Sequence, residues 1–411
     1  MVSSRTLLKI ALVIVALIIT STVVAITPIE AKSQSVQWTW HDGSSVNAGY
    51  PVLSPTGNLY TYSMNGGLAT VHSISPEGKD LWNTSLVLAS MPQFSADGTI
   101  YILEWISNTT SVNGTGLLVL TPEGAVKWTF TVPGLAEGMK ILPDGGVVLG
   151  IEPFYPGQHS LVCLNSNGSV RWTKGSYEIN STNPMMLPVG IHGNDILVAS
   201  TSFVSPSNSV ITEYAPDGTA VRSFRTDFTP SSVSFALDGT MRAVGYNFSR
   251  STGYEYLYAM SDNGSVMWAL LLSNEAGNLV VLSDGTTIFG ESTNSSVLNL
   301  NVYAVDAMGN TLWKSANVKS IPVAFGTGVL FANSTALMLV DRDGGVIWKL
   351  DGSFSGMPVV NGKTIYAGSG NDLLAISEST WKVTWQPVVI VFTIMFAAIG
   401  VGLLGGRSSR D

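Results

Sequence analysis

Short apolar runs of strand length, separated by turns that contain Gly, recur along almost the whole chain. The runs at 117–120 (Leu-Leu-Val-Leu) and 303–305 (Tyr-Ala-Val) are examples, and each leads into a turn that ends in Gly. Other glycines, such as Gly98 in Gly-Thr-Ile-Tyr, open a further strand in each unit. β-Branched and aromatic residues enclosed by such turns are typical of β-strands. The pattern predicts a domain built from strands and turns alone.

A Trp stands four residues after the turn Gly in six of these units. Gly218 heads a seventh unit, in which Arg222 takes the place of the Trp and Phe224 lies nearby. Successive turn glycines are 35 to 50 residues apart, and a repeat of this length made only of strands indicates the blades of a β-propeller. The complete pairs are Gly78 and Trp82, Gly124 and Trp128, Gly168 and Trp172, Gly264 and Trp268, Gly309 and Trp313, and Gly344 and Trp348.

The repeat also predicts how the ring closes. Innermost strands and third strands can each be counted eight times, whereas outermost strands that follow a turn Gly can be counted only seven times. The segment that contains Trp38 and Trp40 precedes the first innermost strand and supplies the missing outermost strand. We therefore expect an all-β, eight-bladed propeller of four-stranded antiparallel blades over residues 36–381, closed by its N-terminal strand in the last blade. Such closure removes open strand edges, which otherwise pair with other chains.

The repeated Trp side chains are predicted to pack between neighbouring blades. An aromatic side chain buried in this way removes roughly 150–250 Å² from water. The expected inter-blade residues are Trp40, Trp82, Trp128, Trp172, Trp268, Trp313 and Trp348.

Two uncharged apolar segments flank the repeat. Residues 10–26 follow a basic N-terminal stretch (residues 1–9), and residues 388–406 precede a short basic tail (residues 407–411). Each segment has about the length that a transmembrane helix needs, and the positive-inside rule predicts that both chain ends are cytoplasmic. We expect a protein of the cell membrane with an extracytoplasmic propeller. The first segment is predicted to be an uncleaved anchor, and a cleaved signal peptide is the alternative.

Both ends of the repeat are expected to leave the propeller on the face that carries the first-to-second and third-to-fourth turns, because the domain begins with an outermost strand and ends with a third strand. This face should look toward the bilayer. The opposite face carries longer second-to-third loops, which are either tolerated insertions or a binding surface for a protein or a cell-surface polymer. These loops are residues 107–116, 152–160, 201–209, 247–255 and 291–299.

Nine Asn-x-Ser/Thr sequons predict N-glycosylation of an exposed domain. At Asn167 and Asn263 the sequon is an Asn-Gly-Ser turn, and turn chemistry alone selects the same residues. The nine positions are Asn83, Asn108, Asn113, Asn167, Asn180, Asn247, Asn263, Asn294 and Asn333.

The charge of the chain limits its possible partners, and its cysteine content limits its possible disulfides. The chain has 20 Lys and Arg against 28 Asp and Glu, and the basic residues at its two ends leave the part between them more acidic still. An acidic surface repels phosphate backbones, so we expect no nucleic-acid partner. The single cysteine, Cys163, cannot form an internal disulfide and is predicted to be a buried core residue.

No catalytic constellation is predicted. The His residues fall in different units without metal-ligand spacing, although His192 is the nearest candidate for a nucleophile in a sulfotransfer reaction. Asp-Gly pairs such as Asp97-Gly and Asp238-Gly are explained as hairpin turns rather than calcium loops. The four His are His41, His72, His159 and His192, and the expected polar members of the channel-facing strands are Glu137, Lys140 and Asn183.

The repeat resembles the pyrroloquinoline-quinone (PQQ) type of propeller repeat. The resemblance rests on segments such as 256–268 (Tyr-Leu-Tyr-Ala-Met-Ser-Asp-Asn-Gly-Ser-Val-Met-Trp), 302–313 and 357–376, and it covers nearly all of residues 36–381. It implies the propeller fold and says little about activity.

The resemblance implies two alternatives for function. Quinoprotein dehydrogenases of this type use PQQ and a calcium ion, and their methanol- and ethanol-oxidising members have adjacent cysteines, whereas this chain has one Cys. The chain is more similar to the non-enzymatic branch, such as the propeller lipoprotein of outer-membrane β-barrel assembly, and its apolar ends and sequons look like those of an archaeal-type surface protein. We expect a non-catalytic binding or scaffold module without cofactor or metal. The alternative is a PQQ-dependent, dehydrogenase-like enzyme that uses the central channel.

Overall fold

The computed structural model describes residues 30–41, 50–65, 68–87, 90–107, 112–132, 134–154, 157–175, 185–201, 209–247, 254–293 and 299–382. Residues Val36–Ser377 form one compact unit, the propeller, while the two chain ends make up a second unit. The predicted membrane segments, residues 10–26 and 388–406, lie outside the described residues. Within the described ranges, no helix has the length and apolar character needed to cross a bilayer.

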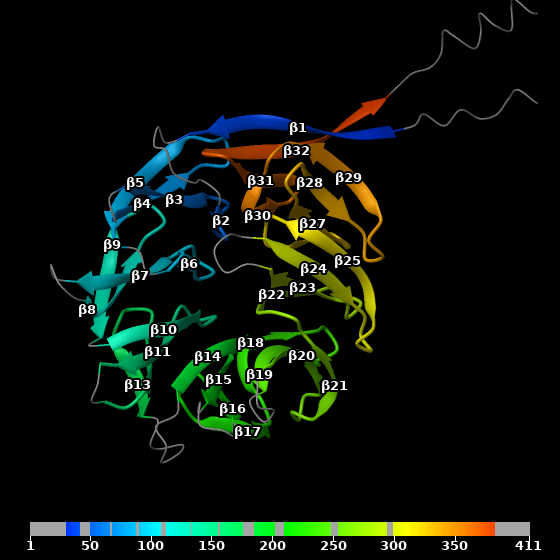
Figure 1. Ribbon diagram of the computed structural model, residues 1–411. Helices are drawn as coiled ribbons and strands as arrows, with labels where there is room; N and C mark the ends of the chain where they lie inside the picture. The colour runs from blue at the N-terminus through cyan, green and yellow to red at the C-terminus, as the bar shows by residue number, and fades with distance from the viewer. Residues whose placement is uncertain are drawn as a thin grey trace, which may run out of the picture. The chain divides into compact units, whose positions relative to one another are not determined.

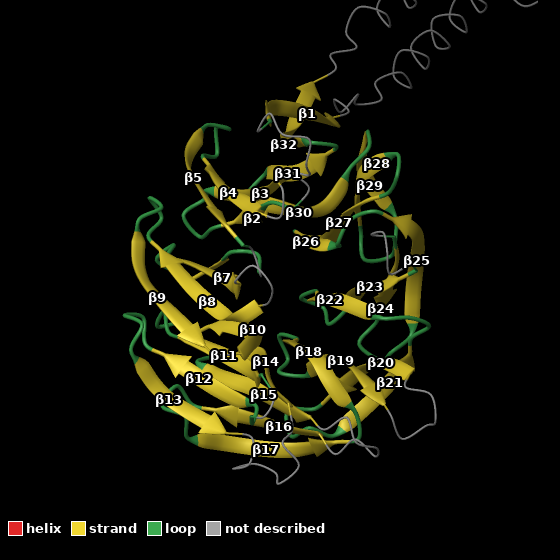
Figure 2. Ribbon diagram, turned by 60° about the vertical axis from the view of Figure 1, so that its left-hand side comes forward, coloured by secondary structure: helices red, strands yellow, loops and turns green. Residues whose placement is uncertain are grey.

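Eight four-stranded sheets make up the propeller and follow one another around a ring (Figure 1). This arrangement confirms the predicted all-β, eight-bladed architecture, and Figure 2 shows strands and loops but no helix in the part of the chain that it describes. In each sheet the first strand is innermost and the fourth is outermost, and the strands pair in the order in which the chain supplies them, except in the last blade.

The first four blades have the following strands. Blade 1 contains β2 (Val52–Leu53), β3 (Leu59–Asn65), β4 (Leu68–Ile74) and β5 (Asp80–Leu86), and blade 2 contains β6 (Gln93–Phe94), β7 (Ile100–Ser107), β8 (Val112–Leu120) and β9 (Val126–Val132). Blade 3 contains β10 (Gly134–Ile141), β11 (Val147–Pro153), β12 (Ser160–Leu164) and β13 (Val170–Gly175), and blade 4 contains β14 (Met185–His192), β15 (Asp195–Thr201), β16 (Ser209–Tyr214) and β17 (Ala220–Thr226).

The remaining blades complete the ring. Blade 5 contains β18 (Thr229–Phe235), β19 (Met241–Asn247), β20 (Tyr254–Met260) and β21 (Val266–Leu271), and blade 6 contains β22 (Ala276–Val281), β23 (Thr287–Ser292), β24 (Leu300–Val305) and β25 (Thr311–Val318). Blade 7 contains β26 (Val323–Phe325), β27 (Gly328–Ala332), β28 (Ala336–Val340) and β29 (Val346–Asp351). Blade 8 contains β30 (Ser355–Asn361), β31 (Thr364–Ser369), β32 (Asp372–Lys382) and β1 (Glu30–Trp40), so the N-terminal strand is its outermost strand, as predicted.

Each hairpin between a third and a fourth strand has a bulge directly after its turn. In blade 2, Val119 pairs with Trp128 and Leu120 pairs with Val126, so Lys127 is the extra residue. The same shift occurs in the third-to-fourth hairpins of blades 1 and 3 to 7. A bulge of this kind increases the local twist and re-aims the side chains beside it. The bulge is therefore part of the repeat.

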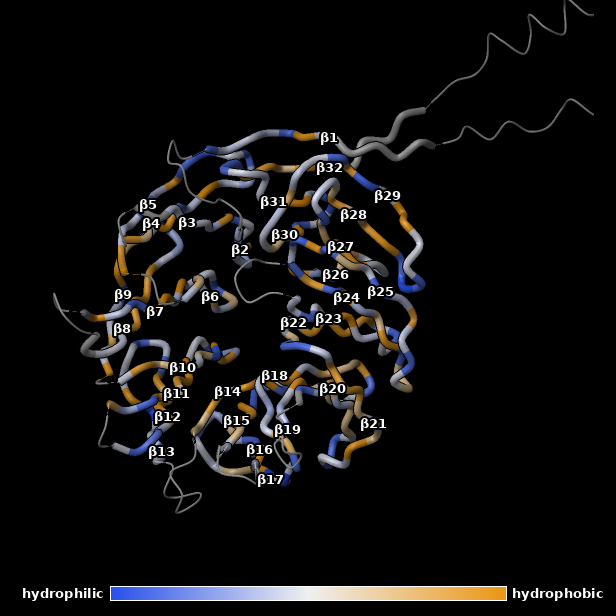
Figure 3. The backbone as a smooth tube through the Cα atoms, viewed as in Figure 1, coloured by the Kyte–Doolittle hydropathy of each residue, from blue (hydrophilic) through white to orange (hydrophobic). Residues whose placement is uncertain are grey.

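Apolar packing joins every blade to the next. Buried apolar side chains form one cluster at each of the eight junctions between neighbouring blades. Leu117 of blade 2 packs with Leu149 of blade 3, and Tyr366 of blade 8 packs with Leu59 of blade 1 across the closing junction. Figure 3 shows hydrophobic stretches along the strands that form these junctions. Because burying one such side chain contributes about 1.5–3 kcal/mol, the junctions can hold the ring without a disulfide.

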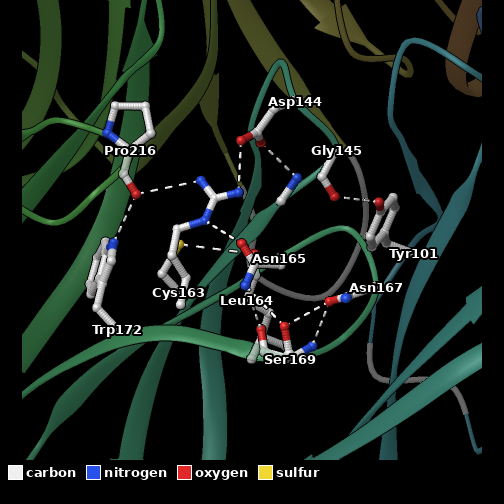
Figure 4. Close-up of polar contacts among 12 residues, drawn as sticks. Tyr101, Asp144, Gly145, Cys163, Leu164, Asn165, Asn167, Ser169, Trp172 and Pro216 are labelled. Atoms are coloured by element: carbon white, nitrogen blue, oxygen red, sulfur yellow. Dashed lines mark hydrogen bonds and ion pairs between the residues drawn. The ribbon is translucent and has the colours of Figure 1, made fainter.

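The repeated Trp links the outer edges of neighbouring blades. Trp172 of blade 3 donates its Nε1–H to the carbonyl oxygen of Pro216 over 2.9 Å (Figure 4), and a Cβ added at Gly218 would lie 3.0 Å from the Trp172 ring. The turn Gly thus makes room for the ring of the preceding blade. Equivalent indole bonds of 2.8–2.9 Å join Trp38 to Pro76, Trp82 to Pro122, Trp128 to Ser166, Trp268 to Ala307 and Trp313 to Arg342.

Closure of the ring changes the surroundings of two predicted inter-blade Trp residues. In β1, Trp38 and not Trp40 packs on Gly78, and Trp40 Nε1 instead donates to Asp80 Oδ1 over 2.9 Å. Trp348 is 6% exposed, and its Nε1 has no hydrogen-bond acceptor within the described part of the chain. The reason is topological, since blade 8 takes its outermost strand from the N-terminus and has no third-to-fourth turn to supply a carbonyl.

The contact between Trp and Gly predicts a difference between two Gly-to-Ala substitutions. Gly124 (φ +86°) and Gly193 (φ +60°) both have left-handed backbone, so Ala costs about 1–2 kcal/mol at either position. At Gly124 the new Cβ would also lie 2.6 Å from the Trp82 ring, whereas at Gly193 it meets nothing within 4 Å. Overpacking should add about 1–3 kcal/mol to the cost of Gly124→Ala. Denaturant unfolding of both variants measures the difference, and equal midpoints would contradict this account of the blade junction.

Candidate binding site between blades 4 and 5

A pocket of about 600 Å³ opens between blades 4 and 5, on the side of the propeller that carries the first-to-second and third-to-fourth turns. Blade 4 contributes His192, Glu213 and Arg222, and blade 5 contributes Thr240 and Asp262, among other residues. This volume lies within the range typical of small-molecule sites, roughly 300–1,000 Å³.

A buried carboxylate organises the blade 4 side of the pocket. The side chain of Glu213 is 4% exposed, and its Oε1 accepts a hydrogen bond from His192 Nδ1 over 2.8 Å. Its Oε2 accepts from Arg222 Nε, and Arg222 Nη1 continues across the gap to the carbonyl oxygen of Asp262. The His192 ring also stacks on Phe235 of blade 5, with the ring centroids 4.6 Å apart. These contacts fix both the imidazole and the guanidinium.

Glu213 and Arg222 stand where other blades pair a small or apolar residue with a Trp. In the other third-to-fourth hairpins, a Trp takes the position of Arg222, and the residue opposite it is small or apolar where blade 4 has Glu213. Phe224 compensates for the missing Trp, because its ring packs against Gly264, the turn Gly of blade 5. Arg222 is therefore not needed for the junction itself. The residues that correspond to Glu213 are Ser73, Val119, Cys163, Ala259, Ala304 and Leu339.

The blade 5 side has a buried charge of opposite sign. Arg242 is 2% exposed, and its guanidinium lies over the Trp268 ring at 5.4 Å from the centroid. Its Nη1 donates to Thr240 Oγ1 over 2.9 Å, and Thr240 Oγ1 in turn donates to Asp238 Oδ1 over 2.7 Å. These bonds hold the exposed Asp238 in one orientation, and the bond from Thr240 lowers the pKa of its carboxyl group. The positions that correspond to Arg242 in four other blades hold Tyr60, Tyr101, Val148 and Ile288.

The gap between blades 2 and 3 lies at the corresponding place in the repeat, without an equivalent of the Glu213–Arg222 pair or of Arg242. A smaller pocket of about 270 Å³ lies there. Lys127 Nζ donates to Thr99 Oγ1 over 3.0 Å, and Tyr101 OH donates to the carbonyl oxygen of Gly145 over 2.6 Å. Arg171, which occupies the bulge position in blade 3, pairs with Asp144 at 2.7 Å (Figure 4). The polar groups of this gap are thus engaged with one another.

The described parts of the channel-facing strands hold few groups that could bind PQQ. Of the predicted polar members, Glu137 and Lys140 lie in β10, and Asn183 lies outside the described residues. Burial raises the pKa of Glu137 to about 7, with a further contribution from its hydrogen bond to Glu152, and burial lowers the pKa of Lys140. PQQ carries carboxylate groups and needs several cationic partners, whereas Lys140 is the only Lys or Arg in the described innermost strands. No group of three acidic, His or Cys side chains suited to a metal ion occurs among the residues described.

The other candidates from the sequence are explained by local structure. His41 pairs with Asp372 at 3.0 Å, and His72 shares a hydrogen bond of 2.9 Å with Ser63. Of the predicted His candidates, His192 lines the pocket. The Asp side chains of the Asp-Gly turns accept backbone N–H groups within those turns, as Asp97 does from Thr99 over 3.0 Å. Cys163 is buried, as predicted, and burial raises the pKa of its thiol to about 11.

The sequons and long loops are only partly within the described structure. Asn167 Oδ1 and Asn263 Oδ1 each accept a hydrogen bond of 3.0 Å from the backbone N–H two residues later, which is the expected turn chemistry. Asn83 is exposed on β5. Sequons Asn108, Asn180 and Asn294 lie outside the described residues, as do central parts of the long loops at 108–111, 155–156, 202–208, 248–253 and 294–298.

A second polar cluster lies between blades 5 and 6, near the ends of β20 and β23. Glu255 is 6% exposed and accepts a hydrogen bond from the Ala276 N–H. Burial, together with the nearby charges of Glu275 and Glu291, raises its pKa to about 7. Burial and the nearby carboxylates of Glu255 and Glu275 raise the pKa of Tyr246 to about 12. These shifted pKa values predict that the stability of the junction depends on pH.

Comparison with known proteins supports the type of repeat. A family model described as outer membrane protein assembly factor BamB matches residues 298–390. Together with the eight-bladed architecture, this match supports a PQQ-like β-propeller repeat protein. No curated protein sequence matches the chain.

Solved structures with a similar chain course have little sequence in common with this protein. The WD40 domain of Pan2 from Neurospora crassa is 9% identical, with a TM-score of 0.46 over 84% of this chain and 95% of that one. A eukaryotic initiation factor is 12% identical, with a TM-score of 0.47 over 75% of this chain and 79% of that one. Similarities at this level support no statement about function.

The buried Glu213 predicts a strong effect of removing its arginine. Arg222→Met should lower the free energy of unfolding by about 3 kcal/mol, because it leaves a buried carboxylate without its main cationic partner. The matched control is Arg225→Met, an exposed arginine on the same strand, which should change stability by less than about 0.5 kcal/mol. The double variant Glu213→Gln with Arg222→Met should recover most of the loss. Denaturant unfolding measures all three, and an unchanged midpoint for Arg222→Met would overturn the assigned role.

The raised pKa of Glu255 predicts a stability that falls as pH rises. The folded protein keeps a proton on Glu255 up to about pH 7, whereas the unfolded chain releases it near 4.5, the ordinary pKa of a Glu carboxyl group. The folded state therefore binds more protons in this interval, so stability falls from about pH 4.5 to 7 and stays lower above that. Glu255→Gln should remove this part of the pH dependence and raise stability at pH 8 by about 2 kcal/mol. The exposed Glu123→Gln, which changes the same charge, is the control, and a pH profile unchanged by Glu255→Gln would refute the prediction.

Proposed function

We propose that this chain is a membrane-anchored, extracytoplasmic binding module that recognises a protein or a cell-surface polymer without catalysing a reaction, and that the pocket between blades 4 and 5 is its recognition site. The observation that carries the proposal is the replacement of an apolar pair of the repeat by Glu213 and Arg222. A buried ion pair is usually no more stable than a well-packed apolar pair, so the stability of the ring does not account for the change. Departures from a structural rule are expected where a protein performs its function.

Sequence and topology support the membrane anchor. Residues 10–26 and 388–406 have the length and apolar character of transmembrane helices, and β1 and β32 pair with each other in blade 8. An anchor at both ends suits a domain whose first and last strands are neighbours. Under this proposal both chain ends are cytoplasmic, and the predicted sequons of the propeller are available for glycosylation.

The acidic turns influence how the pocket meets its partner. Repulsion between their carboxylates and anionic lipid head groups favours a space between this face and the bilayer. Such a space leaves the pocket open to a partner even when the turn face looks toward the membrane. The acidic turn residues are Asp97, Asp144, Asp217, Asp238, Asp262, Asp284 and Asp306.

The similarity to the BamB family model supports a binding role in preference to an enzymatic one. The channel, with Glu137 and Lys140 as its charged members in the described innermost strands, offers little that would hold the quinone of a dehydrogenase. The long loops on the opposite face remain a second surface through which a partner could bind.

Cross-linking of the full-length protein in its native membranes tests the proposal. We expect a partner in stoichiometric amount, cross-linked to blade 4 or blade 5 near the pocket and reduced by Arg222→Met but not by Arg225→Met. Mass spectra of the same sample also show whether sequon peptides such as that of Asn83 carry added mass. A protein that is recovered alone, or a partner that Arg222→Met does not affect, would contradict the proposed site.

A further inference from the structure

Two departures from the repeat meet at one pocket. Blade 4 has Glu213 and Arg222 in place of an apolar pair, and blade 5 has Arg242 where other blades have buried Tyr, Val or Ile. Glu213 lies behind one wall at 4% exposure, and Arg242 lies behind the other at 2% exposure. The side chains that reach the pocket are thus held by buried charged groups on both sides.

The two walls offer opposite chemistry to a ligand. On the blade 4 wall, Arg222 uses Nε and Nη1 in the bonds described above, and no partner for its Nη2 is found among the residues that the structure describes. His192 donates its Nδ1–H to Glu213, since a carboxylate only accepts, and in this tautomer its Nε2 is an acceptor. On the blade 5 wall, Asp262 and the second carboxylate oxygen of Asp238 are exposed acceptors.

The cationic and anionic groups are also close to each other. Arg222 Nη1 donates to the backbone carbonyl of Asp262, so the guanidinium reaches the residue that carries the carboxylate of the opposite wall. A ligand with an acidic group and an amino group only a few bonds apart can therefore meet both walls. An α-amino acid has this arrangement, with one carbon between its carboxylate and its ammonium group.

We propose that the pocket between blades 4 and 5 binds a zwitterionic ligand of the α-amino-acid type, with its carboxylate on Arg222 and its ammonium group on Asp238 and Asp262. The inference rests on the proposed function only in taking this pocket as a binding site. A carboxylate that meets a guanidinium forms charge-assisted hydrogen bonds, which are about twice as strong as neutral ones. The pocket volume of about 600 Å³ leaves room for the ligand side chain.

Two simpler ligands fit the groups less well. A metal ion would use the carboxylates but not Arg222, and the described residues contain no group of three suitable ligands. A neutral sugar would hydrogen-bond to both walls but would bring no positive charge to the exposed Asp238 and Asp262. The zwitterion brings an ammonium group to these carboxylates and a carboxylate to Arg222.

Calorimetric titration of the full-length protein in lipid nanodiscs with individual L-amino acids tests the proposal. We expect at least one of them to bind, and we expect its N-acetyl derivative and its carboxamide, which each lack one of the two charges, to bind about tenfold more weakly or less. Asp262→Asn and the double variant Glu213→Gln with Arg222→Met should each weaken binding of the same amino acid by about tenfold or more.

Arg225→Met is the control and should bind as the unchanged protein does. Asp262 is exposed and Asn has nearly the same shape, so a loss of binding by Asp262→Asn does not arise from misfolding. The proposal is wrong if no amino acid binds, if the singly charged derivatives bind equally well, or if the pocket variants have no effect. Because the cross-linking experiment uses no added amino acid, a failure of this inference leaves its result untouched, and the two proposals can fail separately.

Discussion

The packing of an aromatic ring from one blade on the turn glycine of the next is the contact on which this propeller depends, and it recurs at every junction except that of blades 7 and 8. It requires a residue without Cβ at a positive φ angle on one side and a flat ring on the other. Where the ring is Trp, it fills the space and its Nε1 also satisfies a turn carbonyl that would otherwise face the ring. The contact sets the spacing of neighbouring blades at their outer edge, and the apolar clusters fill the space inside it. Both parts repeat, so the ring is a sum of similar junctions.

Closure of the ring is the point at which this repetition is interrupted. Blade 8 takes β1 from the other end of the chain, so the last blade gains a strand but not the turn that normally precedes it. Trp38 still reaches Gly78 in blade 1, whereas Trp348 packs against blade 8, where no acceptor for its indole N–H is found among the described residues. A buried donor without a partner costs about 1–3 kcal/mol. This cost accompanies the closure of the ring, which removes free strand edges.

The fold could be predicted from the sequence because its rules are local and repeated. The distance from Gly to Trp, the Gly turns and the short apolar runs each report one hairpin, and their count gives the number of blades. The sequence also marks Arg222 and Phe224 as an irregular unit. It does not show that Arg222 lies opposite Glu213 across a bulge, or that Arg242 of the next blade braces Asp238, because these contacts depend on register and on packing between blades. For the same reason the sequence does not show which of Trp38 and Trp40 packs on the turn glycine of blade 1.

Under the proposed function, recognition and not stability accounts for the charges at the junction of blades 4 and 5. The stability of the ring comes from contacts between apolar residues, and Phe224 keeps such a contact at this junction. Glu213 and Arg242 add nothing that an apolar residue would not supply, and each carries a desolvation cost of several kcal/mol that its hydrogen bonds only offset. What they do provide is rigidity, because His192, Arg222 and Asp238 are held in place before a ligand arrives. Groups that are ordered in advance lose less entropy on binding, so a costly pair of buried charges is a means of building a selective polar site into an apolar ring.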